Sequence, residues 1–203
     1  MERSYRGFDG VLYPSHGVVV REGDHLVLLD AAWGADATKE LLVWIDDNIG
    51  LPVARALSTH FHDDRTGGVA VLDAAGIDVW SHPMTQTLSA AAGNPVPPNA
   101  LAALEAPGST VQFGTLEVLY PGGGHADDNI MVWLPEQRIL YGGCAVRELA
   151  TDNLGNTADA DLDYWPQAIR NAQAAYPETE IVIPGHGEPG GPELLEHMHE
   201  LFR

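Results

Sequence analysis

Three residues of the types that bind metal ions, His60, His62 and Asp64, occur at alternate positions within S-T-H-F-H-D-D-R, residues 58–65. They follow residues 54–58, a short apolar stretch typical of a β-strand, and strand ends commonly present functional side chains. Because side chains alternate along extended backbone, both imidazoles are expected on one side of the chain, with the carboxylate two residues further on. Taken alone, the pattern also fits an accidental pair of surface histidines.

Three more residues of these types follow predicted strands later in the chain. His125 comes after P-G-G-G, Cys144 comes after L-Y-G-G, and His186 lies within I-V-I-P-G-H-G. Glycines beside each of them permit close approach of the backbone to a crowded centre. A lone cysteine is more often a small buried apolar residue, so for Cys144 that alternative stays open.

Six candidate ligands are more than one tetrahedral zinc ion can use, and they favour two metal ions. The natural partition is His60, His62 and His125 for one ion, and Asp64, Cys144 and His186 for the other. Three protein ligands on each ion leave a position for water, as in catalytic rather than structural sites. A thiolate ligand favours zinc over magnesium or calcium.

The formal charge of −19, from 29 acidic and 10 basic residues spread along the chain, disfavours nucleic acid and anionic membrane surfaces as partners. The sequence has no apolar run long enough to predict a membrane span, and residues 1–8 do not resemble a signal peptide. The single cysteine excludes an internal disulfide. With 203 residues, 45% of them hydrophobic, we expect one compact domain.

Strand and helix signals are interleaved along the chain, which predicts an α/β layered fold with two sheets and helices outside them. Two β-branched runs joined by Glu-Gly-Asp predict a hairpin over residues 17–31, and apolar spacing closed by Gly50 predicts a helix over residues 36–49. Further strands are expected at residues 54–58, 77–81, 110–120, 130–134, 139–141 and 180–183. Further helices are expected at residues 68–75, 83–91, 161–175 and 192–202, and residues 93–107 are expected to be a surface excursion.

The motifs resemble those of the metallo-β-lactamase superfamily, and within it class B β-lactamases of the first subclass. H-F-H-D-D-R, G-H-A-D-D-N, Y-G-G-C and P-G-H-G occur in the family's order and approximate spacing, and D-A-A-W-G and G-N-T-A-D-A-D-L look similar to VIM-type enzymes. The resemblance implies a single domain over residues 1–203, a four-layer αββα sandwich with two zinc ions at one edge of the sheets and the partition of ligands given above. It also implies that an N-terminal edge strand of the family is missing or trimmed.

The same resemblance implies a substrate site. Asn156 would face the lactam carbonyl, and Trp33 would line an apolar floor. Residues 8–16, which include Phe8 and Tyr13, would form a mobile flap over the substrate.

Two arginines have expected roles of their own. The superfamily's thioesterase and nuclease branches usually carry a metal-binding histidine at the position of Arg65, but a guanidinium cannot bind a metal ion. We expect Arg65 to form an ion pair beneath the metal site that holds Asp64 in place. Arg147, where VIM-type enzymes have Tyr and other members have Lys, is expected to bind the substrate carboxylate, although it also fits a solvated arginine or a partner of Glu148.

The resemblance implies a zinc-dependent β-lactamase that opens the amide of penicillins, cephalosporins and carbapenems by a zinc-bound hydroxide and confers antibiotic resistance. Asp64 and Asn156 would be its catalytic residues, Asp64 orienting the hydroxide. A monomer in the periplasm is expected, and monobactams are expected to be poor substrates. The alternatives are another metallo-hydrolase of this fold, such as a thioesterase or lactonase, and a zinc-binding module without turnover.

Overall fold

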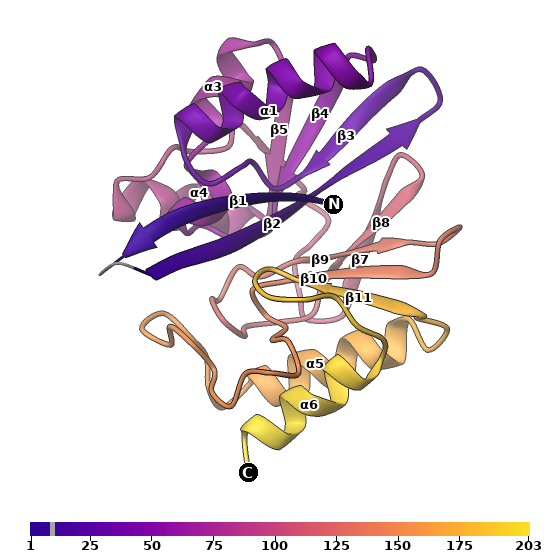
Figure 1. Ribbon diagram of the computed structural model, residues 1–203. Coiled ribbons are helices and arrows are strands. Elements are labelled where there is room, and N and C mark those ends of the chain that lie inside the picture. The colour runs from indigo at the N-terminus through magenta and orange to yellow at the C-terminus, as the bar shows by residue number, and fades with distance from the viewer. Residues whose placement is uncertain (9–10) are drawn as a thin grey trace. The chain divides into compact units, whose positions relative to one another are not determined.

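The computed structural model describes residues 1–8 and 11–203, except for the side chain of Phe8. The chain divides into two compact units, Met1–Leu101 and Ala102–Arg203. Each unit contains one β-sheet and its own helices (Figure 1). Within the described residues, no helix has the length and apolar character needed to cross a membrane.

The first unit has a six-stranded sheet in which the strands follow each other in chain order. The strands are β1 (Glu2–Phe8), β2 (Val11–Glu22), β3 (His25–Leu29), β4 (Val53–Ser58), β5 (Asp78–Ser81) and β6 (Asn99–Ala100). The pairs β1–β2 and β2–β3 are antiparallel, and the remaining pairs are parallel. Parallel pairs need crossover connections, which here contain α1 (Ala35–Asn48), α2 (Asp63–Thr66), α3 (Val69–Ala74) and α4 (Pro83–Ala92).

Helices α1 and α3 cover one face of this sheet (Figure 1). The apolar spacing that predicted α1 places Leu41 and Ile45 in a core with Leu26 and Leu28 of β3. Gly50, just beyond the helix, has φ +68°, a value that favours glycine and ends the helix as expected.

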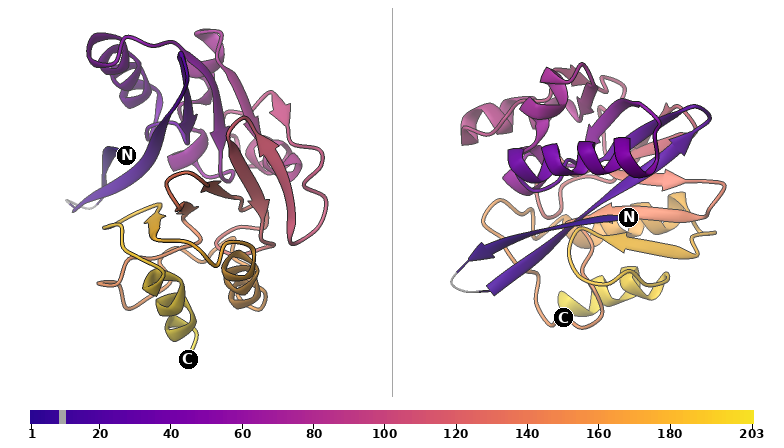
Figure 2. Two further views of the ribbon diagram at one scale, coloured as in Figure 1. Left: turned by 90° about the vertical axis from the view of Figure 1, so that its right-hand side faces the viewer. Right: turned by 45° about the horizontal axis from the view of Figure 1, so that its top comes forward.

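The second unit has a five-stranded sheet in the order β11-β10-β9-β8-β7. In Figure 2 this unit is coloured from pink through orange to yellow. Its strands are β7 (Ser109–Phe113), β8 (Leu116–Tyr120), β9 (Met131–Leu134), β10 (Ile139–Gly143) and β11 (Ile181–Pro184). Adjacent strands are antiparallel except for β10 and β11, which are parallel. Two helices, α5 (Trp165–Ala175) and α6 (Glu193–Leu201), pack with the sheet in one apolar core.

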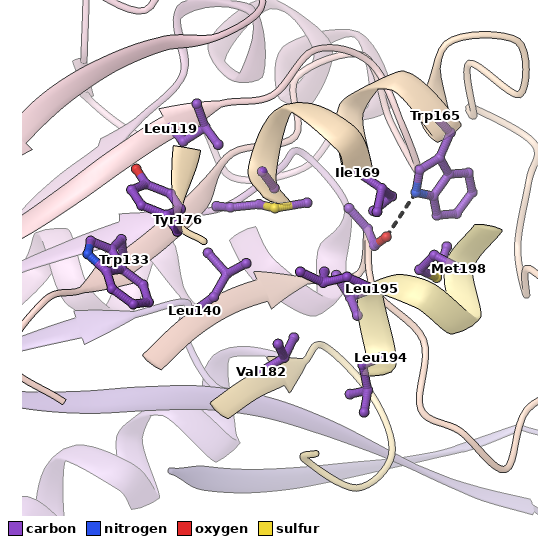
Figure 3. Packing of buried hydrophobic residues seen from close by; sticks show 14 residues of the cluster. Leu119, Trp133, Leu140, Trp165, Ile169, Tyr176, Val182, Leu194, Leu195 and Met198 are labelled. Atoms are coloured by element: carbon purple, nitrogen blue, oxygen red, sulfur yellow. Dashed lines mark hydrogen bonds between the residues drawn. The ribbon is translucent and has the colours of Figure 1, made fainter. Parts of the chain in front are cut away.

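Three aromatic residues, Trp133, Trp165 and Tyr176, lie among the aliphatic residues of this second core (Figure 3). Trp133 stacks on Tyr176 with ring centroids 5.0 Å apart. The fully buried Trp165 donates a hydrogen bond from its indole N–H to the carbonyl of Ala145 at 2.8 Å. Because Ala145 is the neighbour of Cys144, this bond fixes the backbone next to a candidate metal ligand.

The structure differs from the sequence-based elements at four places. The single strand expected over residues 110–120 is wrong, because a turn with Gly114 at φ +70° splits it into β7 and β8. Strand β1 and the short helix α2 were not expected, and β6 lies inside the expected excursion at residues 93–107. The other expected strands and helices are present, with bounds shifted by a few residues.

Candidate metal centre

In the first unit, the three candidate ligands converge directly after β4. His60 Nε2 lies 3.1 Å from His62 Nδ1 and 3.9 Å from an Asp64 carboxylate oxygen. His60 is fully buried, and Asp64 is 7% exposed. Strand β4 ends at Ser58, residues 59–62 form a bend, and helix α2 begins at Asp63. The segment is therefore a bend followed by the helical turn that carries Asp64, and not the extended segment expected from the alternation of His60 and His62.

Arg65 is fully buried and holds this group in place by an ion pair with Asp64. Its guanidinium contacts Asp64 at 3.1 Å and Asp30 at 3.4 Å, and it also donates a hydrogen bond to the carbonyl of His16. The expected contact between Arg65 and Asp64 is therefore present. Burial raises the pKa of the nearby Glu2 to about 7, although the charge of Arg65 acts in the opposite direction.

Asp30, which directly follows β3, was not identified from the sequence. Its carboxylate accepts hydrogen bonds from the backbone N–H of Thr59 at 2.7 Å and from the Thr59 hydroxyl at 2.8 Å. Thr59 directly precedes His60, so Asp30 and Arg65 together hold both ends of the ligand segment. A single acidic residue ending the apolar run L-V-L-L-D is the signal that could have found it.

In the second unit, Cys144 and His186 lie together. Cys144 Sγ is 3.3 Å from His186 Nε2, and Cys144 is 2% exposed. The parallel pairing of β10 and β11 explains this contact, because it aligns Gly143 with Pro184 at the ends of the two strands. The backbone N–H of Gly185 donates to the Gly143 carbonyl at 2.7 Å and continues this pairing toward His186.

His125 lies in the turn that follows β8 and is 8% exposed. Its ring contacts Trp165 edge to face, with centroids 5.9 Å apart. Of the glycines before it, Gly122 is required by the backbone, because it has φ +102° and a Cβ there would lie 2.2 Å from the ring of Tyr164. Asn129 holds the far side of the turn by accepting a hydrogen bond from the N–H of Ala126 at 2.7 Å.

Of the residues expected to contact the substrate in the first unit, Trp33 is half-buried and Tyr13 is exposed. The Trp33 indole N–H donates to the Asp63 carboxylate at 3.1 Å. Tyr13 lies in β2 opposite Arg6 of β1. Of the flap expected at residues 8–16, residues 11–16 belong to β2, and residues 9–10 lie outside the described residues. Phe8 ends β1, and its side chain lies outside what the structure describes.

In the second unit, Arg147 and the loop that carries Asn156 lie side by side. A Cβ built at Gly155 would meet the Arg147 guanidinium at 3.1 Å, and Gly155 has φ +75°, so two constraints favour glycine there. The exposed Asn156 uses its side-chain oxygen to accept a hydrogen bond from the N–H of Ala158 at 3.2 Å. Glu148, the alternative partner of Arg147, accepts a hydrogen bond from the N–H of Glu188 at 2.8 Å.

The chain is similar to known proteins over almost its whole length. Residues 10–186 match the family model described as the metallo-beta-lactamase superfamily. The chain is 37% identical to "Metallo-beta-lactamase type 2" of Bacillus cereus over 198 residues, covering 97% of this chain and 76% of that protein. It is 34% identical to the protein of the same name from Bacteroides fragilis over 190 residues, covering 94% and 76%.

Solved structures of similar proteins support the fold. A metallo-beta-lactamase from Pontibacter korlensis is 42% identical, with a TM-score of 0.92 over 98% of this chain and 92% of that chain. One from Hirschia baltica is 36% identical, with a TM-score of 0.96 over 99% and 92%. The expected fold class, with two sheets and accompanying helices, is confirmed.

Proposed function

The chain belongs to the metallo-β-lactamase superfamily, and we propose on this premise that it is a zinc-dependent hydrolase that opens the amide of β-lactams. The observation that carries the proposal is the contact between Cys144 and His186, at 3.3 Å. A buried thiol beside an imidazole suits zinc. Other branches of the superfamily usually have a metal-binding histidine at the position of Arg65, whose guanidinium is permanently charged. Together, the Cys144–His186 pair and Arg65 favour the lactamase branch.

The six candidate ligands would hold two zinc ions. One ion would bind His60, His62 and His125, and the other would bind Asp64, Cys144 and His186. The donor set fits zinc, because imidazole and thiolate are its usual ligands and three protein ligands leave a position open. Bound zinc lowers the pKa of water to about 7 and polarises a carbonyl group. In this proposal, the two units form a single metallo-β-lactamase domain over residues 1–203.

The chain's own residues would position the reactants. Asp64, held by Arg65, would accept a hydrogen bond from the attacking water and orient it. The amide N–H of Asn156 would donate to the lactam oxygen as negative charge develops there, a contact that contributes about 3 kcal/mol in other hydrolases. The substrate would also contact Trp33, Tyr13 and Phe8.

A panel of substrates tests the proposal. We expect turnover of a penicillin, a cephalosporin and a carbapenem, poor turnover of a monobactam, and loss of all activity on treatment with a chelator. The thioester S-lactoylglutathione is the matched substrate for the thioesterase branch. Its hydrolysis without any β-lactam hydrolysis would overturn the proposal, and fast monobactam turnover would refute the expected spectrum. Resistance, a periplasmic location and a monomeric state belong to the same proposal.

Substitution of Arg147 by alanine is expected to raise KM for a penicillin about tenfold, the lower end of the effect of a charge-assisted hydrogen bond, because the side chain is partly exposed. The substrate carboxylate would be held equally in the ground and transition states, so kcat should change less than KM. Steady-state kinetics measure both values. Arg170→Ala, which removes an exposed arginine bound to Gln167, is the control. A kcat/KM within twofold of the wild-type value would show that Arg147 does not bind substrate.

A further inference from the structure

A three-residue cluster joins the first strand to the ligand segment of the first unit. Arg6 of β1 forms an ion pair with Asp63, the first residue of α2. The guanidinium carbon of Arg6 lies 5.7 Å from the centre of the Trp33 ring, within range of a cation–π contact. The indole N–H of Trp33 donates to the same Asp63 carboxylate oxygen. We call Arg6, Trp33 and Asp63 the latch cluster.

The position of this cluster couples two parts of the unit. Asp63 lies between the candidate ligands His62 and Asp64, whereas Arg6 is two residues from the end of β1. A second bond reinforces the link, because the Trp33 backbone N–H donates to the Ser4 hydroxyl at 2.9 Å. The latch cluster therefore ties the paired strands β1 and β2 to the segment that carries three candidate ligands.

The ion pair is weak enough to open. The side chains of Arg6 and Asp63 are 48% and 44% exposed, so water and salt screen their attraction. Opening would also leave the Asp63 carboxylate without the Arg6 charge beside it. In a chain with a formal charge of −19, an uncompensated carboxylate next to the metal ligands would repel an anionic substrate.

We propose that Arg6 is a positioning residue that latches the paired strands β1 and β2 onto Trp33 and Asp63 and thereby sets the affinity for anionic β-lactams. The role in affinity rests on the proposed function, but the latch itself does not. Two measurements separate these parts: hydrogen exchange of the zinc-loaded protein without substrate, and steady-state kinetics with nitrocefin, a chromogenic anionic cephalosporin.

The exchange experiment tests the latch. In Arg6→Ala, backbone exchange of residues 11–16 is expected to be about two- to fivefold faster than in the wild type at low salt, as for loss of an exposed ion pair. Arg6→Lys keeps the charge, so its exchange rate should stay close to that of the wild type. The control Arg21→Ala, on the neighbouring strand, should have no effect. In concentrated NaCl, the exchange rate of the wild type should rise close to that of Arg6→Ala, because salt screens the ion pair. Equal exchange in Arg6→Ala and Arg21→Ala would overturn the latch.

The kinetic experiment tests whether the latch affects the affinity for the substrate. Arg6→Ala is expected to raise KM for nitrocefin about two- to fivefold with kcat within twofold, because Arg6 does not touch the reacting atoms. The double variant Arg6→Ala with Asp63→Asn should have a KM between those of Arg6→Ala and the wild type, because the exposed Asp63 charge is removed. Its backbone hydrogen exchange should stay as fast as in Arg6→Ala. An unchanged KM in Arg6→Ala would refute the role in affinity. Absence of nitrocefin hydrolysis in the wild type would refute the proposed function instead, and exchange would still decide the latch.

Discussion

Substitution of Arg65 by methionine is expected to lower the free energy of unfolding by about 3 to 5 kcal/mol, the range for removing one partner of a buried ion pair. Methionine keeps most of the side-chain volume, so the loss should come from charge rather than from a cavity. Arg65 and Asp30 are both fully buried, and the side chain of Asp64 is only 9% exposed, so two carboxylates would lose their common cation. Urea unfolding of the zinc-free protein, followed by circular dichroism, measures this change without a contribution from metal binding.

Two other substitutions make this experiment specific. Arg65→Lys keeps the charge but cannot reproduce the planar guanidinium that reaches Asp64, Asp30 and the His16 carbonyl, so an intermediate loss is expected. Arg138→Met removes an arginine whose pair with Glu180 is more than half exposed, and its effect should be close to zero. If Arg65→Met destabilised the protein no more than Arg138→Met, the buried network would not hold the ligand segment.

Substitution of Cys144 by serine is expected to lower kcat/KM for nitrocefin by more than about 100-fold, the upper end of the losses seen when residues that merely orient ligands are changed. A thiol ionises on zinc, whereas a serine hydroxyl stays protonated and binds weakly. The substitution is nearly isosteric, so the apolar surroundings of this buried side chain should be retained. Competition with a chelator measures zinc affinity, and one of two zinc ions should be lost far more easily than the other.

The control for Cys144→Ser is His197→Ala. His197 lies in the same unit and contacts the carbonyl of Thr151 at 2.7 Å, and it is not among the six candidate ligands. Its substitution should leave zinc affinity unchanged. Equal weakening of both zinc ions in Cys144→Ser would contradict the assignment of Cys144 to a single ion, and unchanged affinity would favour the interpretation of Cys144 as a small core residue.

The candidate ligands could be found from the sequence because their positions depend on local rules. Strand ends, flanking glycines and a thiol after two glycines are visible in the chain itself, as at Cys144 and His186. Asp30 and the latch cluster depend on strand pairing and on buried geometry between distant segments. A sequence pattern does not specify that Asp30 meets Thr59, 29 residues away, or that Arg6 meets Asp63, 57 residues away.

The same distinction applies to the fold. Helix α1 and the β2–β3 hairpin were predictable because their apolar periods are regular. Strand β1, with the sequence E-R-S-Y-R-G-F, has little apolar character, and its backbone is stabilised by the antiparallel register with β2. Helix α2 has only four residues and follows an extended His62, so no helical period could reveal it.

Zinc titration of the metal-free wild-type protein, followed by nitrocefin hydrolysis, tests the central claim that six residues hold two catalytic zinc ions. Metal-free protein should be inactive, tightly bound zinc should reach two equivalents per chain, and activity should reach its maximum as the second equivalent binds. Fully active enzyme that never binds more than one equivalent of zinc would contradict the two-zinc centre, and full activity without zinc would contradict a metal-dependent mechanism altogether.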